Sequence, residues 1–185
     1  MRSLPKQPHS NCWWKRTAIS QPSSQTVPSP ARKPAQLSSA RPIAKFVQSG
    51  GVAVFGCGVP SYTTPDEIHD LFTAFDLPWE RRDYHRTTLK LNKAARCINT
   101  TGLVQSYSQK ALYLSNVGKN DAVYLPTRDS KIQSMVFAPE PIEDLAQTAA
   151  AFGRCQKGWV GYTGDVNAEE GTVPLTLAMC GLKVY

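Results

Sequence analysis

The chain has 185 residues, of which 41% are hydrophobic, and it carries a formal net charge of +7. This length suits one domain with a buried core and is hardly enough for two. All of the net charge lies in residues 1–41, which contain seven Lys and Arg and no acidic residue, whereas residues 42–185 carry 14 charges of each sign. A nucleic-acid-binding domain is therefore disfavoured, because residues 42–185 offer no net positive field.

Residues 1–41 are predicted to form a disordered basic leader. They are rich in Pro, Ser and Gln and have few large apolar side chains, so they cannot bury enough surface to offset the entropy of ordering. Three roles stay open for this leader: a mitochondrial transit peptide, an arm that binds polyanions such as nucleic acid, and a solvated tail without a defined role. Nucleic acid is not an expected partner except through this leader.

The cysteines favour a reducing compartment. Their number is odd, they lie far apart and none forms a C-x-x-C pair, which argues against a zinc ribbon and against a disulfide framework. No metal and no cofactor is expected. The chain also lacks the roughly 20 consecutive apolar residues of a transmembrane helix, so no membrane partner is expected. These features predict a cytoplasmic protein, or a mitochondrial one if the leader is a transit peptide.

Residues 42–185 are predicted to form an α/β domain that opens with a helix and a buried strand. In PIAKFVQSGG, apolar residues recur at helical spacing, and Gly50 and Gly51 suit a helix C-terminus. The following VAVFGCG is a short continuous apolar run, which is typical of a strand covered on both faces.

A second helix is predicted in TTPDEIHDLFTAF. Thr64 is the predicted N-cap, Pro65 suits the first helical position, and Glu67 completes a capping box. The apolar residues that follow have the spacing of one helix face.

The middle of the domain is predicted to form β-strands. YHRTTLKLN alternates, so that His85 and Thr87 face one side while Arg86 and Thr88 face the other. KALYLSNV, AVYLP and SMVFAP have the composition of further short strands, and TAAAFGRCQKGWVGYTGDV predicts two strands joined by a hairpin at CQKG.

The polar loop in GYTGDVNAEEGT joins the last strand to a final helix. A helix that began at Asn167 would place Pro174 in its interior at a cost of roughly 3 kcal/mol, so Thr172 is the predicted cap. Asp165 and Asn167 then lie beyond the carboxyl end of a buried strand, where ligands bind in doubly wound sheets. They are candidate ligand-binding residues, and a solvated turn whose polar side chains bond their own backbone is the alternative.

Two glycine-marked stretches, IAKFVQSGGVAVFG and AAAFGRCQKGWVGYTGDVN, resemble the C-terminal half of class I glutamine amidotransferase-like α/β domains. In such domains a helix and a glycine pair lead into a central strand, and a late glycine-rich hairpin precedes the closing helix. The resemblance covers residues 42–182 and implies a three-layer sandwich with a mixed sheet. The sandwich is expected to be divergent or partial, as in a fragment without the N-terminal half of the domain.

The resemblance also implies a nucleophilic cysteine in G-x-C-x-G after the strand, partnered by a histidine in H-x-E. Cys57 follows the predicted strand, where backbone amides can stabilise an oxyanion. The pattern departs from the family because positions 55 and 59 are Phe55 and Val59, and neither His69 nor His85 is followed two residues later by Glu. Cys57 and His85 are the candidate catalytic residues; a small buried residue at a tight turn is the alternative for Cys57.

WERRDYHRTT offers a second candidate ligand site. Arg86 and Thr88 share a strand face and suit a phosphate or carboxylate through guanidinium and hydroxyl hydrogen bonds. The interleaved Glu80 and Asp83 favour local ion pairing as the alternative.

The fold signals are present while the triad signals are incomplete, so the preferred hypothesis is a non-catalytic binding or scaffold domain. The alternative is a hydrolase or amidotransferase-like enzyme that uses Cys57 or the Asp165 loop, and a third hypothesis is polyanion binding through the leader. A sheet with exposed edges is also expected to need a second copy or a partner to cover it.

Overall fold

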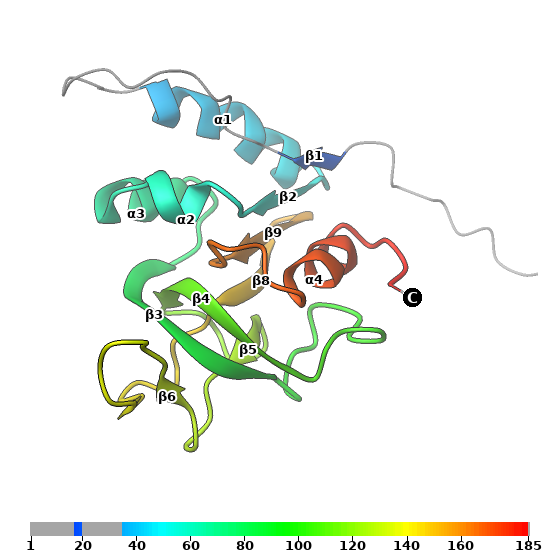
Figure 1. Cartoon of the computed structure of the whole chain (residues 1–185). Helices are drawn as coiled ribbons and strands as arrows, with labels where there is room; N and C mark the ends of the chain where they lie inside the picture. The colour runs from blue at the N-terminus through cyan, green and yellow to red at the C-terminus, as the bar shows by residue number, and fades with distance from the viewer. Residues whose placement is uncertain (1–16, 20–34, 185) are drawn as a thin grey trace, which may run out of the picture.

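The computed structural model of this chain describes residues 17–19 and 35–184. Within them, seven strands form one mixed sheet in the order β1-β2-β9-β8-β5-β3-β4, and β6 pairs with β7 in a separate hairpin (Figure 1). The strands are β1 (Thr17–Ile19), β2 (Val52–Phe55), β3 (Glu80–Leu91), β4 (Ser106–Ser115), β5 (Ala122–Leu125), β6 (Lys131–Ile132), β7 (Glu140–Pro141), β8 (Ala150–Cys155) and β9 (Gly158–Thr163). The helices are α1 (Ala35–Gln48), α2 (Val59–Tyr62), α3 (Pro65–Thr73) and α4 (Thr172–Met179).

Helices cover both faces of the parallel part of the sheet. β2 is parallel to both β1 and β9, and its successive residues point to opposite sides. Ala53 and Phe55 pack into a core with α1 and α3, whereas Val54 packs into a second core with α4. Figure 1 shows α1 and α3 on one side of β2 and α4 on the other. The predicted α/β fold with a mixed sheet is therefore confirmed.

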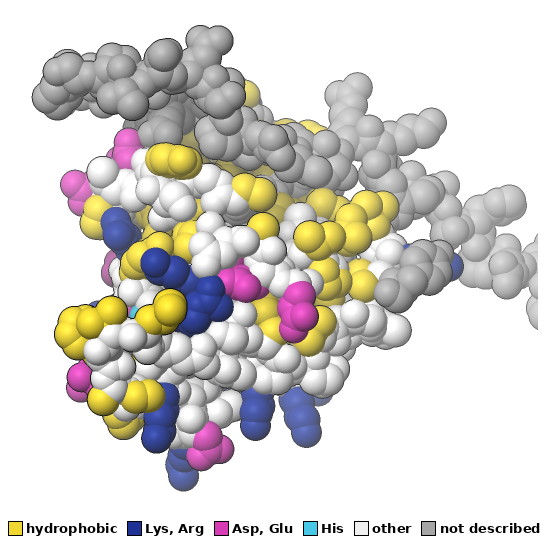
Figure 2. Space-filling model, viewed as in Figure 1, with side chains coloured by type: hydrophobic (Ala, Val, Ile, Leu, Met, Phe, Trp, Pro, Cys, Tyr) yellow, Lys and Arg dark blue, Asp and Glu magenta, His cyan; other side chains and the backbone are white. Residues whose placement is uncertain are grey.

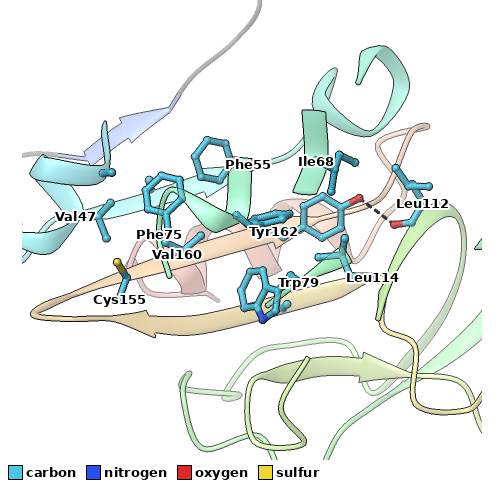
Figure 3. Packing of buried hydrophobic residues seen from close by; sticks show 14 residues of the cluster. Val47, Phe55, Ile68, Phe75, Trp79, Leu112, Leu114, Cys155, Val160 and Tyr162 are labelled. Atoms are coloured by element: carbon cyan, nitrogen blue, oxygen red, sulfur yellow. Dashed lines mark hydrogen bonds between the residues drawn. The ribbon is translucent and has the colours of Figure 1, made fainter. Parts of the chain in front are cut away.

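The first core depends on α3, whose predicted start is confirmed. The Thr64 side chain accepts a hydrogen bond from the Glu67 backbone, and the Glu67 carboxylate accepts one from the Thr64 backbone. This capping box satisfies two of the free N–H groups at the helix start. The helix presents Phe72 to the sheet, and Figure 3 shows the aromatic core around Trp79 and Tyr162 into which this face packs.

The antiparallel part of the sheet is strongly curved, so that β4 forms backbone hydrogen bonds with Thr148, just before β8, and with Gly164, just after β9. The Leu112 N–H donates to the Gly164 carbonyl at 2.9 Å, and Leu114 and Thr148 exchange two backbone hydrogen bonds of 2.8 and 2.9 Å. The Tyr162 hydroxyl, inside the first core, donates to the Leu112 carbonyl at 3.0 Å (Figure 3). Part of the β4 edge is thus paired within the chain.

The predicted boundary between residues 1–41 and 42–185 falls inside α1, which begins at Ala35. The strand β1 also comes from the predicted leader and pairs with β2. The rest of the predicted leader, and with it the proposed polyanion arm or transit peptide, lies outside the described residues.

The segment SMVFAP was expected to be a strand, and this prediction is wrong. It is the loop between β6 and β7, where Met135, Val136 and Phe137 are 103%, 82% and 74% exposed. Pro139 and Pro141 lack the N–H group that a ladder needs, which limits the hairpin to two paired positions. Figure 2 shows hydrophobic side chains exposed around this hairpin, at the lower left of the molecule.

Candidate functional site

Two segments that are far apart in the sequence meet at one edge of the sheet. β2 and β9 are parallel neighbours, with Phe55 opposite Tyr162, so the chain leaves both strands on the same side. Gly56 makes this approach possible, because a Cβ on it would lie 2.4 Å from the Thr163 hydroxyl. The turn after β2 therefore lies beside the loop after β9.

Cys57 occupies the turn after β2 in a strained conformation. Its φ is +55°, in the left-handed region that non-glycine residues rarely adopt, and its side chain is exposed. The turn is closed by a hydrogen bond of 3.1 Å from the Val59 N–H to the Gly56 carbonyl, and α2 follows directly. This strand–turn–helix arrangement presents the Cys57 thiol at the edge of the sheet.

Asp165 organises the loop after β9 instead of facing a ligand. Its carboxylate is buried and accepts hydrogen bonds from the Asn167 N–H at 2.9 Å, from the Glu169 N–H at 2.6 Å and from the Thr172 hydroxyl. These contacts favour the turn alternative for Asp165, because its oxygens already have partners. The Asn167 side chain is exposed at the rim of the loop and donates to Glu169.

Arg86, on β3, binds the same loop through Glu169. Its guanidinium forms an ion pair with Glu169 and donates to the Ser108 hydroxyl at 3.4 Å. Both members of the ion pair are partly buried. Figure 2 shows basic and acidic side chains side by side near the centre of this face. The predicted Arg86 site is therefore joined to the Asp165 loop, although the two are distant in sequence.

The Cys57 turn, the loop after β9 and α4 line an open pocket of about 510 Å³. Cys57 forms part of one wall, and the loop from Asp165 to Ala168 forms another. The third wall, α4, could not be predicted from the sequence, because this helix is apolar on all sides and no face of it is distinguished. The residues of α4 that line the pocket are Thr172, Val173, Thr176 and Leu177.

None of the described histidines lines this pocket. His69 lies on the surface with its Nδ1 4.0 Å from the Glu80 carboxylate. His85 is buried inside the curled sheet, where its ring stacks on Tyr113 at 4.4 Å. The predicted catalytic pair of Cys57 and His85 is therefore divided between the pocket and the interior of the sheet.

Burial lowers the pKa of His85 below its ordinary value of 6.5, while the charge of Asp83 acts in the opposite direction. Below pH 6.5, His85 is protonated in the unfolded chain but stays neutral in the folded chain until the pH reaches its lower folded-state pKa. The free energy of unfolding therefore falls as the pH falls from 6.5 toward that lower pKa. We expect the free energy of unfolding, measured with urea between about pH 7.5 and about pH 5, to show this loss in the wild type and not in His85→Gln.

The control for this titration is His69→Gln, because the His69 side chain is 59% exposed. That variant is expected to keep the pH dependence of the wild type. An unchanged pH dependence in His85→Gln would contradict the role given to burial of His85.

Thr88 lines a different pocket. Its hydroxyl accepts a hydrogen bond of 2.9 Å from the Gln133 amide, and it lines a second pocket of about 220 Å³ with Lys90 and Lys131. Arg86 and Thr88 share a strand face as predicted, but their side chains have different direct partners: Ser108 and Glu169 for Arg86, and Gln133 for Thr88. A single ligand held by both residues is therefore not supported.

Within residues 17–19 and 35–184, no group of three His, Cys, Asp or Glu side chains is arranged to hold a metal ion. Across the same residues, no helix combines the length and the apolar character needed to cross a membrane. Comparisons of the chain with protein-family models, with curated proteins and with solved structures found no match. The amidotransferase-like assignment thus stays a prediction from its two glycine-marked stretches.

Proposed function

We propose that this protein is a non-catalytic binding protein whose pocket between Cys57, the Asp165 loop and α4 holds a small uncharged molecule. The observation that carries the proposal is the convergence of these three segments at the carboxyl ends of two adjacent parallel strands. Ligands of open α/β sheets bind at this edge. The pocket volume of about 510 Å³ lies in the range of small-molecule sites.

The lining indicates the chemistry of the ligand. Val173 and Leu177 supply apolar walls, and no Lys, Arg or His is among the residues that line the pocket. The Thr176 hydroxyl donates to the Thr172 carbonyl within the helix, which leaves its oxygen free to accept a hydrogen bond from a ligand. These features favour a mostly apolar molecule with one or two hydrogen-bonding groups.

A binding role is favoured over catalysis because, within the part of the chain that the structure describes, no available base lines the pocket. The one lining carboxylate, Asp165, is 2% exposed and already accepts three hydrogen bonds. General-base catalysis at Cys57 needs a basic group within hydrogen-bonding reach of the thiol or of a bridging water.

The proposal is tested with a library of small uncharged molecules, each with an apolar body and one amide or hydroxyl group, screened by ligand-detected NMR. We expect binders of the wild type to lose at least tenfold in affinity for Leu177→Trp, because the larger side chain fills the pocket from α4. Leu182→Trp is the matched control: Leu182 is 53% exposed and does not line the pocket. Equal loss in both variants, or no binder in the library, would count against the proposal.

A second candidate function is an enzyme with Cys57 as nucleophile. It is supported by the exposed thiol at φ +55° between a strand and a helix, an arrangement found in nucleophile elbows, and it agrees with the amidotransferase-like resemblance. The same geometry serves the binding proposal if the strained turn only shapes the pocket wall.

Alkylation by iodoacetamide separates the two candidates. Among the four cysteines in the described residues, Cys57 is expected to react first at neutral pH, because Cys155 and Cys180 are buried and burial, helped by Asp121, raises the pKa of Cys97 to about 11. The binding proposal predicts a Cys57 rate within about threefold of a short cysteine peptide, whereas an activated nucleophile requires a rate at least about tenfold higher at the same pH. Peptide mapping by mass spectrometry measures the rate at each cysteine.

A further inference from the structure

Five buried side-chain polar atoms inside the curled sheet make no hydrogen bond of good geometry within the described residues. Among them, the Tyr107 hydroxyl lies close enough to Gln109 and Thr172 for both side chains to oppose the effect of burial on its pKa. Every one of these side chains is at least nine-tenths buried, from 0% exposed for Tyr113 to 9% for His85. Buried polar groups in folded proteins are almost always paired, so a group of five requires an explanation. The five atoms are His85 Nε2, Tyr107 OH, Gln109 Nε2, Tyr113 OH and Gln147 Oε1.

Four of these groups lie on the inner face of the sheet, on β3 and β4. Thr87 of β3 pairs with Gln109 of β4, and His85 pairs with Ala111, so His85 and Gln109 share one face. The His85 ring stacks on the Tyr113 ring with an interplanar angle of 15°. Gln147 reaches the same group from outside the two strands.

Asp83 links Gln147 to this group. The Gln147 amide donates to the Asp83 carboxylate at 2.9 Å, and the charge of Asp83 acts on both His85 and Tyr113. Tyr107 lies at the other end of the row, where a Cβ on Gly171 would approach its ring to 2.5 Å. The row therefore runs from Gln147 toward Gly171, the N-cap residue of α4.

The unpartnered atoms are uncharged and of mixed hydrogen-bonding character. Burial lowers the pKa of His85 and raises the pKa of Tyr107 and of Tyr113, so these three side chains are neutral near pH 7. Gln109 Nε2 can only donate, Gln147 Oε1 can only accept, and a tyrosine hydroxyl can do both. An ion is a poor match for such a set, whereas a molecule that both donates and accepts is a good one.

Water is the smallest molecule of this kind. Each buried polar group that is left unpaired is destabilising, so five of them would remove a large part of the stability of a domain. Globular proteins hold about one buried water per 27 residues, and each makes about three hydrogen bonds. We propose that the inside of the curled sheet binds a cluster of ordered water molecules through His85, Tyr107, Gln109, Tyr113 and Gln147.

The first test removes single hydroxyl groups. If Tyr113 OH is bonded to ordered water, Tyr113→Phe lowers the folding equilibrium constant by about two- to tenfold, as expected for a lost buried hydrogen bond. Tyr162→Phe is the reference, because the Tyr162 hydroxyl has a protein partner in Leu112. Tyr62→Phe is the control: Tyr62 is 78% exposed, so this variant is expected to leave the folding equilibrium constant unchanged. A Tyr113→Phe variant as stable as the wild type, or more stable, overturns the proposal.

The second test identifies the partner. Cross-relaxation between water and protein protons in the wild type is expected to show long-lived waters next to Tyr113, Gln109 and Gln147. If Tyr113→Phe is destabilised but no such waters are seen, the five groups bond one another in solution and the proposal is overturned. Loss of these water signals in Tyr113→Phe, with the rest of the spectrum retained, supports it.

Discussion

Gly164→Ala is expected to lower the free energy of unfolding by about 3 kcal/mol, because it opens the curled sheet. A Cβ on Gly164 would lie 2.0 Å from the Leu112 carbonyl oxygen, and backbone atoms of β4 cannot move away as a flexible side chain does. The same carbonyl accepts the Tyr162 hydroxyl, and the Leu112 N–H donates to Gly164. One methyl group therefore disturbs two of the hydrogen bonds that hold β4 to residues 162–166.

The matched control is Gly118→Ala. Gly118 is exposed, and its added Cβ would meet the Asp121 carboxylate at 3.1 Å, which is the end of a side chain that can turn away. Its free energy of unfolding is expected to stay within about 0.5 kcal/mol of the wild type. Urea unfolding of both variants measures the difference, and equal stabilities would show that the closure of β4 is not rigid.

Phe72→Ala is expected to lower the free energy of unfolding by about 3–5 kcal/mol. Phe72 is fully buried and makes edge-to-face contacts with Phe55, Trp79 and Tyr162 at ring distances of 6.2, 5.0 and 5.7 Å. Its removal costs the transfer free energy of the ring and leaves a cavity between α3 and the sheet, since three surrounding aromatic rings cannot collapse into it together.

Phe137→Ala makes the same chemical change in the β6–β7 loop. Phe137 is 74% exposed, so its removal is expected to change the free energy of unfolding by no more than about 0.5 kcal/mol. Thermal and urea unfolding of the two variants side by side provide the measurement. A small loss in Phe72→Ala would mean that α3 is not packed on the sheet as described.

The elements that the sequence predicts well are those fixed by short-range chemistry. The capping box at Thr64 and Glu67, and the hairpin between β8 and β9, need only residues a few positions apart. The prediction of a strand at SMVFAP was wrong. Its composition suits a strand, but the neighbouring prolines lack the N–H groups that strand pairing needs.

Individual residues of the candidate site were predicted from the sequence, but their proximity in the fold was not. Cys57, Arg86 and Asp165 were each singled out, but only the parallel pairing of β2 with β9 and the Arg86–Glu169 ion pair bring them together. Long-range pairing of this kind leaves no local signal in the sequence. The contribution of α4 was missed for a related reason: a helix that is apolar all round does not indicate which face will line a pocket.

The most direct test of the proposed pocket is protection of Cys57 from alkylation. The tightest binder from the NMR screen is added at saturation, and the iodoacetamide rates of Cys57 and Cys97 are followed by peptide mapping. If the ligand sits between the Cys57 turn, the Asp165 loop and α4, the Cys57 rate falls at least tenfold and the Cys97 rate is unchanged. An unprotected Cys57 in the presence of a saturating binder would contradict the account, since it would place the binding site elsewhere on the protein.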